Sequence, residues 1–154
     1  MFANKQLTVF PEAVRAEFLE RILGPSGRDL QAQIRNEQSA WQSLVAMPTP
    51  PTDAKPIARG LDACTGRFAS TLYGSLEVVL NAAPHLEVKI GPLNHSGRLS
   101  HWSGDAFLLS FDNPDVAPGL LTFNFESSSH ASRLVGSRIP GVFSTDYGRF
   151  ERIG

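Results

Sequence analysis

Hydrophobic residues in the first third of the chain recur at helical spacing. Val14, Phe18 and Ile22 follow one another at intervals of four residues, which places them on one face of an α-helix. Pro11 precedes them, and proline suits the first turn because its missing N–H would have no partner there. Gly24 comes directly after the run and is typical of a helix end. The pattern predicts an amphipathic helix between Pro11 and Gly24.

A second run of the same kind follows Asp29, whose side chain can cap a helix N-terminus. Its apolar positions form one stripe that contains Leu30, Ile34, Trp41 and Val45. Both predicted helices are amphipathic, and neither has enough apolar area to be stable alone in water. Each therefore needs a surface to pack against.

Prolines interrupt the helical pattern between Met47 and Pro56. They favour an extended, semi-rigid connector and cannot continue a helix. The sequence is therefore predicted to have three parts: a helical segment at 1–46, a proline-rich linker at 47–60 and a further domain at 61–154.

After the linker the hydrophobic period changes from about 3.6 residues to two, which is typical of strands with one dry and one wet face. The alternation is clearest in four segments. They contain Leu76, Val78 and Leu80; Leu86, Val88 and Ile90; Phe107, Leu109 and Phe111; and Leu121, Phe123 and Phe125.

Weaker strand signals bring the expected number to about eight, joined by links too short for crossover helices. Eight antiparallel strands with one dry face can form a closed barrel or a sandwich. The barrel is slightly favoured because closure removes unpaired edges. The weaker strands surround Phe68, Leu99–Trp102, Leu134–Ile139 and Phe150–Ile153.

The composition of the chain mainly excludes certain kinds of partner and site. The 154 residues carry a net charge of −1, from 14 basic and 15 acidic residues, which argues against a nucleic-acid partner. No apolar run is long enough for a membrane-spanning helix, so no membrane partner is expected. The first six residues also lack the basic start and apolar stretch of a signal peptide. The single cysteine, Cys64, excludes an internal disulfide and a multi-cysteine metal site.

Motifs for catalysis are missing. Penicillin-binding enzymes need Ser-x-x-Lys on a helix, and none of Lys5, Lys55 and Lys89 stands three residues after a serine. Gly-x-Ser-x-Gly and the phosphate-binding glycine loops are also absent. Histidines and carboxylates are scattered without the spacing of a compact metal motif. We therefore expect no enzyme activity, catalytic residue, metal site or cofactor.

From Leu61 onward the sequence resembles a C-terminal domain of unknown function that follows serine β-lactamase-like hydrolase domains. The resemblance rests on an ordered set of short motifs and covers residues 61–154. The motifs are Leu61–Phe68, Tyr73–Val78, Gly91–Leu93, Leu99–Trp102, Asp105–Phe107, Leu121–Phe123 and Gly148–Arg152.

The resemblance implies a lipocalin-like, eight-stranded antiparallel barrel preceded by two amphipathic helices. The segment 1–46 is similar to the tail of the same hydrolases, with Pro11 to Leu23 matching their final helix. The implied function is a non-catalytic accessory domain for domain packing or substrate presentation. Its implied partner is a serine hydrolase domain, or a second copy of the chain, through the N-terminal helices.

The alternative hypothesis is a stand-alone binder of a small apolar ligand in the barrel lumen. The bulky residues on the dry faces favour a packed interior instead. Aromatic surface and polar groups could still line an opening, although ordinary packing of a barrel rim explains the same residues. The candidates for ligand binding are Tyr73, His95, Arg98, His101 and Trp102.

Overall fold

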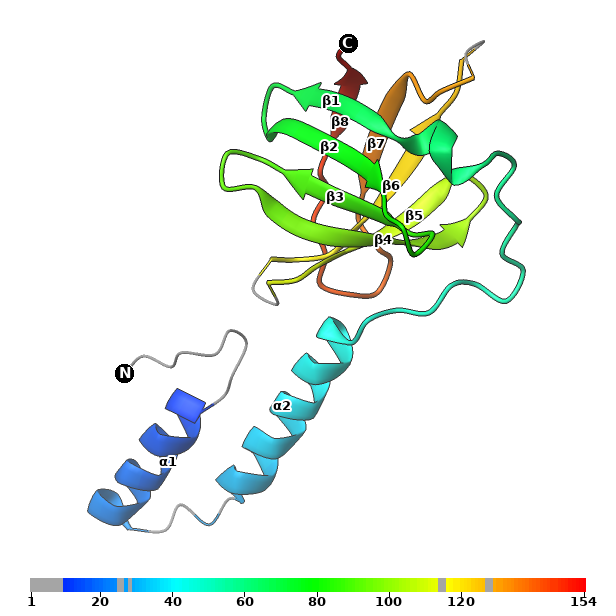
Figure 1. The fold of residues 1–154 in the computed structure, drawn as a ribbon. Coiled ribbons are helices and arrows are strands. Elements are labelled where there is room, and N and C mark those ends of the chain that lie inside the picture. The colour runs from blue at the N-terminus through cyan, green and yellow to red at the C-terminus, as the bar shows by residue number, and fades with distance from the viewer. Residues whose placement is uncertain (1–9, 25–26, 28, 114–115, 127–128) are drawn as a thin grey trace. The chain divides into compact units, whose positions relative to one another are not determined.

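The computed structural model of the protein describes residues 10–24, 27, 29–113, 116–126 and 129–154, and it contains two compact units, Met1–Ala46 and Met47–Gly154 (Figure 1). The predicted fold class is confirmed: two helices precede a closed, eight-stranded antiparallel barrel. The elements are α1 (Phe10–Leu23), α2 (Leu30–Val45), the 3-10 helix η1 (Leu61–Cys64), β1 (Gly66–Ser70), β2 (Gly74–Leu80), β3 (Leu86–Ile90), β4 (His95–Ser103), β5 (Ala106–Phe111), β6 (Gly119–Asn124), β7 (Arg133–Ser137) and β8 (Arg149–Arg152).

Both helices have the ends that their sequence predicts. Gly24 adopts a left-handed φ of 85° after α1, and its N–H donates to Glu20 O at 3.0 Å. The Asp29 carboxylate caps α2 by accepting from Ala32 N at 2.8 Å. No residue of α1 is buried. On α2, the side chains of Leu30, Trp41 and Val45 lie outside the described part of the structure.

The barrel is closed because its first and last strands pair. Each strand is hydrogen-bonded to its neighbours in sequence, and β1 pairs with β8 through Phe68 opposite Arg152 and Ala69 opposite Glu151. In Figure 1 the short β8 lies beside β1 and completes the ring. Every strand therefore has two partners, and the sheet has no open edge.

The dry faces predicted from the alternation meet inside the barrel. Of the four clear segments, only Leu80 departs fully from this pattern, because it is the last residue of β2 and is exposed. Phe111 and Phe125 pack against the core but are only partly buried. The interior is filled by Phe68, Leu76, Val78, Leu86, Val88, Ile90, Leu99, Phe107, Leu109, Leu121, Phe123, Leu134 and Phe150, each 4% exposed or less.

The proline-rich segment contacts the barrel. Lys55 N donates to Ser103 Oγ at 3.0 Å, and Gly104 N donates to Lys55 O at 2.7 Å. Further along, Ile57 packs against the barrel core and the Arg59 guanidinium lies 4.5 Å from the Phe125 ring centroid. These contacts tie the segment to the β4–β5 turn and to the end of β6.

The loop between β7 and β8 passes very close to the sheet at Tyr147. A Cβ atom added to Gly136 would lie 2.7 Å from the Cβ of Tyr147 and 2.9 Å from its backbone. At Gly119, an added Cβ would lie 2.9 Å from the Tyr147 ring and 2.8 Å from Thr145 O. The two glycines thus make the room in which Tyr147 is buried.

Replacing Gly136 by alanine is expected to destabilise the barrel by about 1–3 kcal/mol, because a backbone atom cannot move aside as a side chain can. Chemical denaturation followed by fluorescence measures the change. Gly60→Ala is the matched control, since Gly60 has a φ of −62° and an added Cβ would meet only the Asp62 side chain. Equal stability of Gly136→Ala and wild type would contradict the packing of Tyr147 against β7.

Candidate functional site

The barrel has two ends with different structures. The first, here called the tyrosine end, carries the turns between β1 and β2, β3 and β4, β5 and β6, and β7 and β8. The second, the η1 end, carries η1 and the remaining turns. The five ligand-binding candidates are distributed over both ends and the outer wall.

Tyr73 and His95 lie at the tyrosine end. The Tyr73 hydroxyl donates to Asp146 O at 3.0 Å, and its ring centroid lies 5.2 Å from that of Tyr147. His95 meets Phe111 edge-on at 6.4 Å between ring centroids, and Phe111 lies 5.9 Å from Tyr147. The aromatic rings close this end of the barrel, with Tyr147 at their centre.

His101 and Trp102 lie at the end of β4, toward the η1 end. His101 Nε2 lies 3.0 Å from Gly104 O, and its ring packs edge-on against Phe107 at 5.6 Å. Trp102 belongs to a separate apolar cluster on the outer wall, with Leu108 and Leu120. The two adjacent side chains therefore face different surroundings.

Arg98 is exposed on the outer wall, midway along β4. It lines a hollow of about 200 Å³, together with residues of β3, β4 and the loop after β5. The lining residues are Glu87, Val88, Lys89, Ser96, Gly97, Arg98 and Asp112.

The structure thus links Tyr73 to His95 only indirectly, through the rings of Tyr147 and Phe111. It places Arg98, His101 and Trp102 elsewhere. Sequence reasoning did not assign Glu87, Lys89, Ser96 or Asp112 to the same hollow as Arg98. The sequence contains a signal for this arrangement. Gly91–Leu93 separates two segments with alternating hydrophobic and polar residues, and pairing these segments as a hairpin would place their outward-facing residues side by side.

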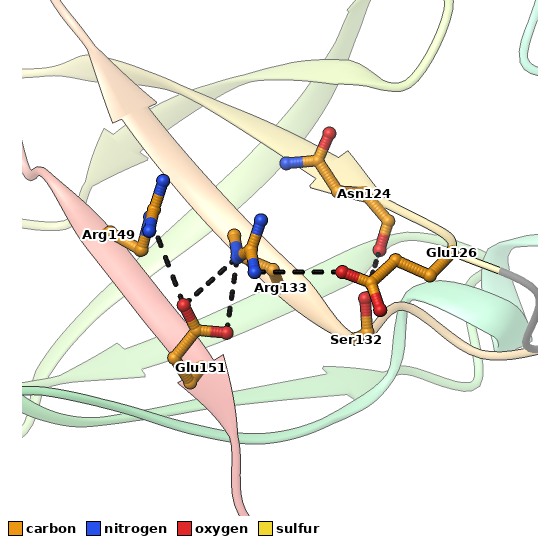
Figure 2. A network of polar contacts seen from close by, with 6 residues as sticks. All are labelled: Asn124, Glu126, Ser132, Arg133, Arg149 and Glu151. Atoms are coloured by element: carbon orange, nitrogen blue, oxygen red, sulfur yellow. Dashed lines mark hydrogen bonds and ion pairs between the residues drawn. The ribbon is translucent and has the colours of Figure 1, made fainter.

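A polar network shows how cations on another part of the outer wall are neutralised (Figure 2). On β7, Arg133 Nε lies 2.9 Å from Glu151 Oε1, and its Nη2 lies 3.6 Å from Glu126 Oε1. Arg149 Nε is 3.9 Å from the same Glu151 oxygen. These exposed ion pairs each contribute up to about 1 kcal/mol to the free energy of unfolding. The network therefore orders the side chains but adds little to stability.

Two buried groups are held in their protonated forms. Burial, together with the nearby carboxylates of Asp105 and Asp62, raises the pKa of the Cys64 thiol to about 12. Burial also raises the pKa of Tyr147 to about 12, while its hydroxyl donates to Ala117 O at 2.5 Å. A thiol in this state is a poor nucleophile, which assigns Cys64 to the core.

The described residues contain no group of three or more His, Cys, Asp or Glu side chains suited to a metal ion. In the same part of the chain, no helix combines the length and the apolar character needed to cross a bilayer.

Comparison with solved structures gives one informative similarity. The fold is similar to that in a crystal structure described as the C-terminal domain of penicillin binding protein Rv0907, with a TM-score of 0.52 and 22% sequence identity. The match covers 70% of this chain and 97% of that one. At this identity the similarity shows a shared fold. No family model matches the chain, and no curated protein matches it.

Stability is expected to fall as the pH rises from about 9 toward 12. The folded-state pKa values of Cys64 and Tyr147 lie above their ordinary values of 9.0 and 10.0, so deprotonation favours the unfolded chain. Urea denaturation at pH 8 and at several higher values measures the loss. Tyr147→Phe should reduce this alkaline loss, although it costs about 1 kcal/mol at pH 7 by leaving Ala117 O without its donor.

Tyr73→Phe is the matched control, because it also removes a hydroxyl that donates to a carbonyl, from a half-buried side chain. Its alkaline loss should be larger than that of Tyr147→Phe, because Tyr73 makes only the smallest contribution to the raised pKa of Tyr147. The same alkaline loss in Tyr147→Phe as in wild type would contradict the role assigned to Tyr147.

Proposed function

We propose that this chain is a non-catalytic accessory β-barrel module that packs beside a serine β-lactamase-like hydrolase domain. The observation that carries the proposal is the fold similarity, which extends over 97% of a C-terminal domain from a penicillin binding protein. The motifs between Leu61 and Arg152 support the same origin.

The barrel interior supports a packing role. Four phenylalanines, Phe68, Phe107, Phe123 and Phe150, are at most 1% exposed and occupy the lumen. Phe107 and Phe123 pack edge-on, with ring centroids 5.4 Å apart. A lumen filled in this way argues against the alternative function, the binding of a small apolar ligand inside the barrel.

The docking segment in this proposal is α1. Its side chains Phe18, Ile22 and Leu23 are 60%, 63% and 78% exposed, although large apolar residues in a helix normally face a core. We propose that the hydrolase domain covers this apolar surface and that a second copy of the chain does so when the hydrolase domain is absent.

Native mass spectrometry of the purified chain tests the docking role. We expect a dimer of bare mass, in which apolar side chains of α1 are buried between copies. A double substitution, Phe18→Glu with Ile22→Glu, should yield a monomer because it places two charges in the buried surface. Glu17→Gln is the matched control on the same helix and should remain a dimer, because Glu17 forms only an exposed ion pair with Arg21.

Two results would overturn the proposal. One is a monomer of bare mass whose α1 is cleaved rapidly by protease, which would show a helix without a partner. The other is an additional mass that is present in every preparation and disappears on denaturation, which would support the ligand-binding alternative.

The absence of catalysis is tested separately with β-lactams. Intact-mass measurement after incubation with a fluorescent penicillin should show no covalent adduct, because none of the three lysines follows a serine at the required spacing. A serine β-lactamase serves as positive control. Stoichiometric acylation of the chain would contradict a non-catalytic role.

A further inference from the structure

We propose that the outer-wall hollow around Arg98 is a binding site for a free α-amino acid or a similarly small zwitterion. This site is independent of the docking function proposed above. It is formed by the outer surfaces of β3 and β4 and by Asp112, directly after β5.

The register of the strands brings two cations to this hollow. On β3 and β4, Lys89 lies opposite Ser96 and Glu87 lies opposite Arg98. Lys89 and Arg98 are therefore diagonal neighbours on one face, about 7–8 Å apart at their backbones and within reach of one ligand. Asp112 is fixed beside them, because its N–H donates to Ser96 O at 3.0 Å.

Glu87, the cross-strand neighbour of Arg98, is engaged elsewhere. Its Oε1 accepts from Asn81 Nδ2 at 2.6 Å and lies 3.1 Å from His85 Nε2. The hydrogen bond from Asn81, followed by that with His85, lowers the pKa of the Glu87 carboxyl. Arg98 lowers it further through space but forms no ion pair with Glu87.

Among the residues that the structure describes, Lys89, Arg98 and Asp112 form no ion pair, although Glu77 of β2 lies opposite Lys89 and Glu87 lies opposite Arg98. This differs from the other side of the barrel, where Arg133 is paired with Glu126 and Glu151. Charged groups of both signs that face a hollow and form no ion pair with one another are available to a ligand.

The size and the charges of the hollow select the ligand class. A volume of about 200 Å³ is smaller than that of pockets for drug-sized molecules, so it suits one small molecule. The guanidinium and ammonium groups match a carboxylate, and Ser96 adds a hydroxyl donor. The Asp112 carboxylate favours an ammonium group beside that carboxylate and opposes a multiply charged anion such as phosphate.

Titration of the full chain with L-alanine, followed by backbone amide NMR shifts, tests this assignment. We expect saturable shifts concentrated at Lys89, Ser96, Gly97 and Arg98. Arg98→Gln should weaken binding at least tenfold, and Lys89→Gln should weaken it several-fold. Arg67→Gln is the matched control, because Arg67 is an exposed arginine of β1 that does not line the hollow.

Comparator ligands separate a zwitterion site from general attraction to positive charge. N-acetylalanine and inorganic phosphate should each bind at least tenfold more weakly than L-alanine, and Asp112→Asn should reduce the difference between L-alanine and N-acetylalanine. Thermal unfolding confirms that each variant is folded.

The proposal would be overturned by an absence of saturable shifts or by equal binding of phosphate and L-alanine. Unchanged affinity in Arg98→Gln would also overturn it.

Discussion

Pairing of β1 with β8 is the contact on which the remaining structure depends. It is short, with Phe68 opposite Arg152 and Ala69 opposite Glu151, yet it supplies both terminal strands with a second partner. Arg152 strengthens the same junction, because its guanidinium donates to Thr65 O and Ala131 O and lies over the Phe68 ring. Without this closure the alternating dry faces would have no common interior to fill.

Closure also determines where function can be located. Because large apolar side chains occupy the interior, chemistry is confined to the two ends, the outer wall and the helices. The tyrosine end is closed by packed rings around Tyr147, and the core keeps Cys64 protonated. On the outer wall, Lys89 and Arg98 line a hollow without forming an ion pair in the described part of the chain, and α1 retains exposed apolar surface at Phe18 and Ile22.

Much of the fold could be predicted from local patterns. Alternation at Leu121, Phe123 and its neighbours identified strands because each strand has one buried face, and Asp29 identified a helix start because capping is local. The sites depend on distant contacts. Lys89 and Arg98 become neighbours only through the β3–β4 register, and Tyr147 is buried only because Gly119 and Gly136 leave room for a loop.

Closure through the first and last strands also has a consequence for how the chain folds. The contact between Arg152 and Thr65 spans 87 positions, so β1 keeps an unpaired side until β8 has been synthesised and has found it. During synthesis the other strands can pair in sequence as hairpins, whereas this junction bears the full entropy of closing a long loop. The barrel is therefore most open to wrong strand partners immediately before its final strand docks.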